Sequence, residues 1–416
     1  MSVKKKKVVR PKRAKSRSDK IGAEEMAARE DKFLLKTYKR SPFHPVKGKG
    51  AVLTDVNGRK YWDLFSGIAV NSLGYGHPAI VRVLREAAKD GILHVSNLYY
   101  QPWQGLLAEK LVLLSGLKKV FFGNSGTEAN EGALKFARLK NPGREKVIAL
   151  DGSFHGRTLG ALSVTGSEKY RGPFKPLIPG AVFIKPNDME ALRREATADT
   201  LAMILEPVLG EGGVIPLENA FLAEARKLAD KTGAVLIFDE VQTALGRTGT
   251  MFAFQQSGVM PDIMTMAKPI GGGLPLGAIL VGPSIEGLVA PGHHASTFGG
   301  NPLACRLGIA VVDEIFRKGL VKKVSETGKW FGSELAGLAS RSSSIAEIRG
   351  RGLMWGIELK VDAAPVAAKL LEKGFIVGTA RNNVIRIVPP FIIPRSALTG
   401  FIKTFEKILK ETENAK

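Results

Sequence analysis

Short hydrophobic runs alternate with longer amphipathic stretches through the middle of the chain. The hydrophobic runs predict strands at Val120–Phe122, Lys146–Leu150, Ala181–Ile184, Leu201–Leu205, Ala234–Phe238, Ile263–Met266 and Gly277–Val281. Helical spacing of the hydrophobic residues is found between several of them, at Glu128–Leu139, Met189–Glu195 and Phe221–Lys231. Strands that alternate with helices are typical of a largely parallel α/β sheet, which we expect over residues 120–285.

The last hundred residues have a different pattern. Residues 303–340 read as helical, 345–359 and 375–388 are rich in strand-forming residues, and 394–412 are again helical. Here strands and helices are grouped rather than strictly alternating. This grouping predicts a smaller C-terminal α+β domain.

Composition is that of a globular protein, but the charge is uneven. The 416 residues are 44% hydrophobic and 24% charged, and the net charge is +22. Residues 1–20 hold ten basic residues against the single acid Asp19, a net +9. Because this segment has no aromatic residue and no periodicity, we predict a disordered basic tail, with organelle import and non-specific nucleic-acid contact as alternatives. It lacks the hydrophobic core of a secretory signal.

The number of cysteines and the length of the hydrophobic runs exclude further classes of protein. Cys305 is the single cysteine, which excludes an intramolecular disulfide and a cysteine-based zinc site. No uncharged hydrophobic run reaches the roughly 18 residues that a membrane helix needs. His293 and His294 are adjacent, which is poor ligand spacing, so we expect no metal. A cytoplasmic protein without membrane contact is predicted.

Residues capable of catalysis follow three of the predicted strands. Asp239 comes directly after Ala234–Phe238, and Lys268 follows Ile263–Met266 and precedes three glycines. The segment Gly123–Glu128 opens a predicted helix, whose N-terminal N–H groups attract anions. Each feature alone has a common structural explanation, such as capping. Together, a phosphate site, a carboxylate and a lysine at the ends of parallel strands suit pyridoxal phosphate.

Nine ordered segments extend this pattern to a family. The chain resembles the class III, fold-type I pyridoxal-phosphate aminotransferases, most closely their acetylornithine branch, from about Ser41 to Phe405. The resemblance is carried by SGIAVNSLGYGHP (66–78), HVSNLYY (94–100), FFGNSGTEANEGALKFAR (121–138), SFHGRTLGALSVTG (153–166), LEPVLGEGGV (205–214), LIFDEVQTALGRTG (236–249), PDIMTMAKPIGGGLPLGA (261–278), STFGGNPLAC (296–305) and VIRIVPP (384–390).

The resemblance implies a division of the chain. It implies a large cofactor-binding domain at 76–310, with a mainly parallel seven-stranded sheet. It also implies a small α+β domain, built from an N-terminal segment at 21–75 and a C-terminal segment at 311–416. The tail at 1–20 lies outside the pattern.

Cofactor contacts are also carried over from the family. Lys268 resembles the lysine that links covalently to pyridoxal 5'-phosphate and shuttles the proton, and Asp239 the carboxylate that pairs with the ring nitrogen. Further contacts with the cofactor are implied for Ser125, Gly126, Thr127, Phe154, Val241, Gln242 and Thr297. Thr297 is expected to reach the cofactor phosphate of a partner subunit, which implies a homodimer with shared active sites. His155 is given no catalytic role.

Substrate recognition is implied for two arginines. Arg157 resembles the residue that binds the distal carboxylate of the amino donor, and Arg386 the receptor for the second carboxylate of glutamate and 2-oxoglutarate. Glu211 resembles a gate that neutralises Arg386 when no second carboxylate is present. Ser296 is expected at the substrate as well.

The implied reaction transfers the δ-amino group of N-acetylornithine to 2-oxoglutarate by a ping-pong mechanism. The products are N-acetylglutamate semialdehyde and glutamate, a step of arginine biosynthesis. Alternative donors are ornithine, 4-aminobutyrate, succinylornithine and a carrier-linked lysine, and an aminomutase shares the fold. Val52–Asp55 and Tyr75 depart from the family pattern. Since Val52–Asp55 lies in the segment that helps close the donor pocket, the identity of the donor is the open point.

Overall fold

A seven-stranded sheet forms the centre of the molecule in the computed structural model, which describes residues 22–414. The predicted basic tail at 1–20 lies outside these residues. The strands are β4 (Lys119–Gly123), β5 (Lys146–Leu150), β6 (Ala181–Ile184), β7 (Thr200–Leu205), β10 (Val235–Asp239), β11 (Ile263–Met266) and β12 (Gly277–Val281). Their order is β4-β12-β11-β10-β7-β5-β6, and only β12 pairs antiparallel with its neighbours. The predicted fold class, with a mainly parallel sheet, is confirmed.

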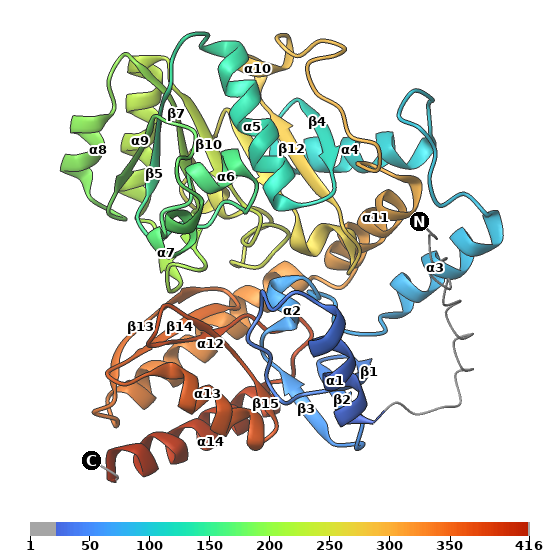
Figure 1. The fold of residues 1–416 in the computed structure, drawn as a ribbon, viewed down its shortest axis with the longest axis vertical. Helices are drawn as coiled ribbons and strands as arrows, with labels where there is room; N and C mark the ends of the chain where they lie inside the picture. The colour runs from blue at the N-terminus through green and yellow to red at the C-terminus, as the bar shows by residue number, and fades with distance from the viewer. Residues whose placement is uncertain (1–21, 415–416) are drawn as a thin grey trace, which may run out of the picture.

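Both faces of this sheet are covered by helices, which explains the continuous hydrophobic runs. Val235 and Ile237 of β10 join the core under α5 (Gly126–Lys140), whereas Leu236 and Phe238 join the core under α9 (Asn219–Thr232). Successive side chains of a strand point to opposite faces, so each face receives every second residue. Figure 1 shows α5 and α9 on the upper part of the molecule, around the sheet.

The two ends of the described chain meet in a second sheet. Its order is β1-β2-β3-β15, with strands at Pro45–Lys49, Val52–Asp55, Lys60–Asp63 and Phe375–Ile376. The parallel pair Phe375–Trp62 joins the C-terminal segment to the N-terminal one, and both lie in the lower part of Figure 1. A third sheet has the order β13-β14-β17-β16, with strands at Ile345–Arg351, Met354–Leu359, Val384–Ile387 and Gly378–Ala380.

Helices join these sheets. The remaining helices are α1 (Ala23–Phe33), α2 (Ser66–Ala69), α3 (Pro78–Asp90), α4 (Pro102–Ser115), α6 (Leu159–Ser163), α7 (Glu168–Arg171), α8 (Met189–Glu195), α10 (Pro283–Glu286), α11 (Pro302–Arg317), α12 (Leu320–Ala339), α13 (Ala363–Glu372) and α14 (Arg395–Asn414). The helical stretch expected at 303–340 is divided at Gly319, whose φ of 57° interrupts it. The predicted domain limit at residue 310 falls inside α11, and the domain limits stay a prediction.

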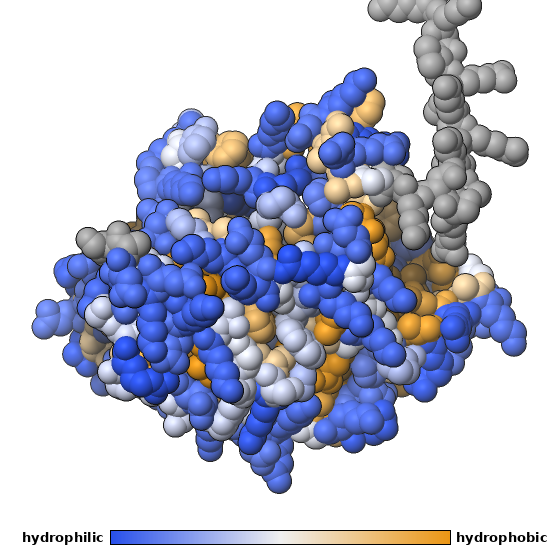
Figure 2. Space-filling view, turned by 90° about the horizontal axis from the view of Figure 1, so that it is seen from below, coloured by the Kyte–Doolittle hydropathy of each residue, from blue (hydrophilic) through white to orange (hydrophobic). Residues whose placement is uncertain are grey.

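The end of the molecule that carries α13 and α14 is polar on its surface. Figure 2 views the molecule from this side and shows mostly hydrophilic residues, with small hydrophobic clusters between them. Helix α14 accounts for part of this, because Phe401, Phe405 and Leu409 on one side of it are buried and its lysines are exposed. The helix is amphipathic and covers the core of the small domain.

Candidate active site

One cavity of about 420 Å³ lies at the carboxyl ends of β10 and β11. Most of the site residues predicted from the sequence line it: Ser125, Gly126, Thr127, Phe154, Arg157, Asp239, Val241, Gln242 and Lys268. Ligands of open α/β sheets gather at this edge, because strand ends and helix N-termini converge there. The remaining predicted residues, Glu211, Ser296, Thr297 and Arg386, do not line this cavity.

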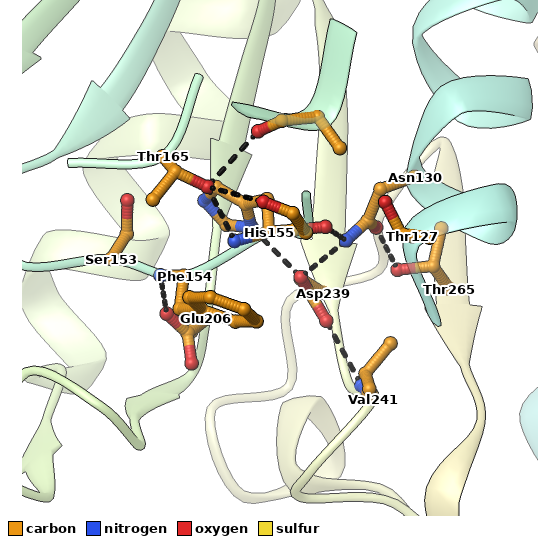
Figure 3. A network of polar contacts seen from close by, with 12 residues as sticks. Thr127, Asn130, Ser153, Phe154, His155, Thr165, Glu206, Asp239, Val241 and Thr265 are labelled. Carbon is orange, nitrogen blue, oxygen red and sulfur yellow. Dashed lines mark hydrogen bonds and ion pairs between the residues drawn. The ribbon is translucent and has the colours of Figure 1, made fainter. Parts of the chain in front are cut away.

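Asp239 lies at the centre of a buried hydrogen-bond network (Figure 3). Its Oδ2 accepts from His155 Nδ1 at 2.7 Å and from Asn130 Nδ2 at 2.7 Å, and its Oδ1 accepts from the backbone N–H of Val241 at 3.0 Å. Only 3% of Asp239 is exposed. Three donors hold the carboxylate in one orientation.

Asn130 was not predicted from the sequence, although its position offers a signal. It follows Gly126 by four residues on α5, so both lie on the same face of that helix. Thr265 of β11 donates to Asn130 Oδ1 at 2.7 Å, which orients the amide so that its nitrogen faces Asp239. His155, which was given no catalytic role, also supports Asp239, because its Nδ1 donates to the carboxylate, which can only accept.

Glu206 is a second buried carboxylate that sequence reasoning missed. It directly follows β7, and its Oε1 and Oε2 accept from the backbone N–H groups of Phe154 at 2.9 Å and Gly210 at 3.0 Å. Burial raises its pKa to about 7. The signal that identified Asp239, a carboxylate at the end of a central strand, applies equally to Glu206.

The N-terminus of α5 forms a narrow cradle beside Asp239. The hydroxyl of Ser125 accepts from Glu128 N at 3.2 Å as the N-cap, and the Thr127 hydroxyl lies 2.8 Å from the Thr158 hydroxyl. A side chain at Gly126 would lie 2.7 Å from Val241 Cγ1. The cradle therefore brings backbone N–H groups and hydroxyls to a gap that no side chain at residue 126 fills, as an anionic group requires.

Gln242 has an unused hydrogen-bonding atom in the same cavity. Its Oε1 is buried without a partner among residues 22–414. A buried polar atom without a partner is costly, so its place in the cavity wall points to a ligand with a polar group. Together with the cradle of α5, this atom fits a cofactor that carries both a phosphate and a ring oxygen.

Lys268 lies in the left-handed region of backbone conformation. Its φ is 35°, in the turn that follows β11. Such strain in a residue other than glycine occurs mostly at functional sites. Burial lowers the pKa of the Lys268 amine below its usual value, although the nearby charges of Asp239 and Glu211 oppose this shift. At a given pH, a larger fraction of this amine is therefore neutral than of the amine of a surface lysine.

Arg157 lies at the cavity wall with its guanidinium on an aromatic ring. Its Cζ is 3.9 Å from the ring centroid of Tyr170 and 5.5 Å from that of Phe154. No carboxylate within residues 22–414 forms an ion pair with Arg157 in the structure, and the residue is exposed. The aromatic contacts orient the guanidinium and leave its donors for a ligand.

Arg386 of β17 and Glu211 form an ion pair close to Lys268. Arg386 Nη1 lies 2.6 Å from Glu211 Oε1, and the arginine side chain is 2% exposed. The Arg386 guanidinium also lies on Phe65, with Cζ 5.0 Å from the ring centroid. The two charges have opposite effects on the pKa of the Lys268 amine, which Glu211 raises and Arg386 lowers.

Ser296 and Thr297 line a different cavity of about 710 Å³. The Ser296 hydroxyl accepts from Gly299 N at 3.0 Å and lies 3.2 Å from Asn124 Nδ2. Thr297 is exposed. Within one chain, neither residue lines the cavity that holds Lys268, although Ser296 contacts Asn124, which does line it.

The buried carboxyl of Glu240 gives a prediction about the pH dependence of stability. Burial raises its pKa from 4.5 to about 7, although Ala253 N, Phe254 N and Thr243 Oγ1 all donate to it. Because the folded state binds this proton more tightly, the contribution of Glu240 to stability is full below pH 4.5 and is lost as the pH rises to about 7. The loss is on the order of 3 kcal/mol, at 1.36 kcal/mol per pKa unit.

Glu240→Gln removes this titration. We expect the melting temperature of the variant, minus that of the unsubstituted protein, to be larger at pH 8 than at pH 5, because only the unsubstituted protein loses the contribution of Glu240. Differential scanning calorimetry at both pH values checks this. Melting temperatures that differ by the same amount at both pH values would contradict it.

Two further properties of residues 22–414 can be stated. None of their helices has the length and hydrophobicity needed to cross a membrane. The same residues contain no cluster of three histidine, cysteine or acidic side chains arranged to hold a metal ion.

Comparison with known proteins extends over nearly the whole chain. The profile of the family Aminotransferase class-III matches residues 35–409. The acetylornithine aminotransferase of Methanocaldococcus jannaschii is 44% identical over 389 residues, which cover 92% of this chain and 97% of the relative.

Solved structures agree with this comparison. The structure of the acetylornithine aminotransferase from Elizabethkingia anophelis has a TM-score of 0.81 and 30% identity, and covers 94% of this chain and 99% of that one. An ornithine aminotransferase structure from Toxoplasma gondii, described with partial occupancy of PLP at its active site, has a TM-score of 0.90 and 30% identity, with 95% of each chain covered.

Proposed function

Since the chain belongs to the class-III aminotransferase family, we propose that it transfers the δ-amino group of N-acetylornithine to 2-oxoglutarate. The products are N-acetylglutamate semialdehyde and glutamate, and the reaction serves arginine biosynthesis. The observation that carries the proposal is the 44% identity to an acetylornithine aminotransferase over nearly the full length.

Enzymes of this family depend on pyridoxal 5'-phosphate, and so does this chain. When bound, the cofactor carries the amino group between the two substrates and accepts the electron pair released at the substrate carbon. In our proposal, the α5 N-terminus with Ser125, Gly126 and Thr127 binds its phosphate. The cofactor ring is held by Asp239 at the ring nitrogen and Gln242 at the ring oxygen.

The other walls of the cavity confine the cofactor ring. Phe154 would pack on the cofactor ring and Val241 would contact the cofactor, since both line the cavity. His155 and Asn130 orient Asp239 from behind, so that its carboxylate would be directed at the ring nitrogen. A charged carboxylate in that position keeps the ring nitrogen protonated.

Lys268 is proposed as the residue that binds the cofactor covalently and moves the proton. Its Nζ would carry the proton that leaves the substrate carbon. Burial lowers the pKa of Nζ below its usual value, which makes the neutral amine more available for this transfer. The strained backbone at Lys268 directs the side chain from the end of β11 into the cavity.

Two substrates of different shape must use this cavity in turn. Acetylornithine presents its amine far from its only free carboxylate, whereas 2-oxoglutarate has a second carboxylate next to the reacting carbon. We propose that Arg157 binds the far carboxylate of both, because its guanidinium is exposed and unpaired among residues 22–414. Arg386 is then needed only for the second carboxylate.

Glu211 is proposed to cover Arg386 while acetylornithine is bound. The ion pair of 2.6 Å neutralises an arginine that would otherwise attract the carboxylate of ordinary α-amino acids. A substrate with a carboxylate at that position competes with Glu211 for the guanidinium. Glu211 is 25% exposed at its side chain, so it borders on space into which it can move.

We expect variants of this pair to affect the two half-reactions in opposite ways. Glu211→Ala should slow the acetylornithine half-reaction while the glutamate half-reaction stays equal or becomes faster. Arg386→Ala should do the reverse, with a loss of roughly 2–5 kcal/mol of carboxylate recognition on the glutamate side. Single-turnover kinetics with each amino donor measure both effects. Equal losses in both half-reactions for both variants would mean that the pair is only structural.

A homodimer with shared active sites is proposed from the position of Thr297. This residue is exposed on the wall of the second cavity and does not reach the cofactor cavity of its own chain. Large exposed hydrophobic residues lie beside it, with 89% of Leu98, 67% of Tyr99 and 60% of Phe298 exposed. A second copy that covers them would place Thr297 at the partner's cofactor phosphate.

We also propose that the protein is located in the cytoplasm.

Comparison of amino donors tests the proposed substrate. With 2-oxoglutarate as acceptor, we expect N-acetylornithine to give a higher kcat/KM than ornithine, 4-aminobutyrate and succinylornithine. The carboxylate and the blocked α-amine of acetylornithine match a site with Arg157 free and Arg386 covered. A higher kcat/KM for any of the other donors would replace the proposal with that donor. Product formation without 2-oxoglutarate would indicate an aminomutase.

A further inference from the structure

Four residues form one row across the third sheet. Arg349 of β13 faces Gly356 of β14, Gly356 faces Arg386 of β17, and Arg386 faces Gly378 of β16. Residues directly opposite each other in antiparallel strands project on the same face of the sheet. With neighbouring strands about 4.8 Å apart, two arginines therefore stand roughly 10 Å apart on one face, separated by a glycine.

The turn that carries Glu211 lies over the glycine between these arginines. This turn connects β8 (Val208–Leu209) to β9 (Ile215–Pro216). A side chain at Gly356 would lie 2.7 Å from the carbonyl oxygen of Gly213 and 3.0 Å from Val214 Cβ. The turn therefore packs directly on the backbone of β14, which is possible because residue 356 has no side chain.

The Arg349 side chain binds the backbone of this turn. Its Nε donates to the carbonyl oxygen of Gly213 at 2.9 Å, while its Nη1 lies 2.6 Å from carboxylate oxygens of both Glu347 and Glu358. The Arg349 side chain is only 9% exposed. The two carboxylates orient the guanidinium, so that its Nε stays directed at the turn.

The opposite end of the turn is held from the large domain. Glu206 Oε2 accepts from Gly210 N at 3.0 Å. Glu211 thus lies between two fixed backbone groups, the N–H of residue 210 and the carbonyl of residue 213. Its side chain reaches Arg386, which stands in the same row as Arg349.

We propose that Arg349 is a positioning residue that holds the 210–214 turn so that Glu211 covers Arg386. This inference rests on the proposed function, in which Glu211 and Arg386 distinguish the two substrates. Without the Arg349 contact, the turn is free to lift from β14, and Glu211 competes less well with an incoming carboxylate. Arg349 itself does not contact the substrate in this proposal.

Arg349→Met in the full-length holoenzyme tests the proposal. We expect the ratio of the single-turnover rate with glutamate to that with acetylornithine to rise about tenfold, the size expected for one lost hydrogen bond of a charged group. Arg349→Lys retains one donor and should recover part of the ratio. Arg351→Met is the matched control. Arg351 lies two residues along the same strand and donates to Leu217 O, which follows β9 and lies outside the 210–214 turn, so the ratio for this variant should stay within about twofold.

Binding of inhibitors gives a second measurement that does not depend on turnover. Isothermal titration calorimetry should show about fivefold tighter binding of glutarate, a dicarboxylate, to Arg349→Met, because a less well held Glu211 competes less for Arg386. Binding of butyrate, a monocarboxylate, should not change. Gly356→Ala displaces the turn with Arg349 intact, and should shift glutarate binding in the same direction even if Arg349→Met does not fold.

Three outcomes would overturn the proposal. They are equal slowing of both half-reactions in Arg349→Met, unchanged glutarate binding in the variants that fold, and a shift in Arg351→Met as large as in Arg349→Met. Failure of the proposed function is recognised separately. In that case the unsubstituted enzyme does not react with acetylornithine, while the glutarate comparison still reports whether Arg349 governs access to Arg386.

Discussion

Lys268→Ala is expected to abolish amino-group transfer while the fold remains intact. We propose that Lys268 both links the cofactor and moves the proton, and loss of a positioned acid–base group alone lowers rates by about 10²–10⁴-fold. The left-handed backbone at Lys268, with φ of 35°, is slightly less favourable for alanine than for glycine but already accommodates a side chain. The melting temperature should therefore stay within a few degrees, since the lysine lines the cavity rather than the hydrophobic core.

Three measurements check this prediction. Borohydride reduction of the unsubstituted holoenzyme followed by peptide mapping should locate the bound cofactor on Lys268. Single-turnover kinetics with acetylornithine give the loss of rate, and calorimetry gives the melting temperature. Lys410→Ala is a suitable control, because Lys410 lies on the surface of α14 in an ion pair with Glu406. A Lys268→Ala protein with full activity would disprove the assignment.

Asp239→Asn is expected to retain the cofactor and to lose about 10²–10³-fold in rate, the usual cost of removing one preorganised electrostatic contact. A neutral amide cannot keep the ring nitrogen protonated. The substitution also disturbs the network around the carboxylate. With its oxygen facing His155 and Asn130, the new amide nitrogen meets the N–H of Val241, and one buried donor loses its partner at about 1–3 kcal/mol.

Cofactor content after release in alkali and single-turnover rates separate these effects. We expect near-stoichiometric cofactor, a lower melting temperature and the large loss of rate together. Asp313→Asn serves as the control, since Asp313 is in a surface pair with Lys110 and should change neither rate nor stability appreciably. An Asp239→Asn enzyme with a rate within a few-fold of the unsubstituted one would mean that this carboxylate does not support the chemistry.

Much of the fold is predictable from the sequence because its signals are local. Leu201–Leu205 is hydrophobic at every position and forms β7, which is buried throughout. A strand in a sheet covered on both faces has no solvent-facing positions, so its sequence shows a run rather than an alternation. The helix expected at Glu128–Leu139 extends as α5 from Gly126, with Ser125 as its cap. The division between α11 and α12 at Gly319, the helices α3 and α4 and the strand order of the sheets had to come from the structure.

The sequence also determined the catalytic core of the candidate site. Asp239, Lys268 and the start of α5 each lie at the end of a central strand or the start of the helix after it. In a parallel sheet these ends meet at one edge, and this does not depend on the conformation of the loops. That geometry brings these residues together around one cavity.

Tertiary structure decided the contacts between side chains that lie far apart in the sequence. Helix and strand periodicity does not predict such contacts. Glu211 and Arg386 are 175 residues apart and pair because the β8–β9 turn of one sheet region packs on the strands of another. Asn130, His155 and Glu206 act through hydrogen bonds whose partners depend on side-chain direction, which sequence spacing leaves open. The row from Arg349 to Arg386 exists only once the register of β13, β14 and β17 is set. Strand ends follow from local hydrophobicity, whereas register and domain packing depend on the whole chain.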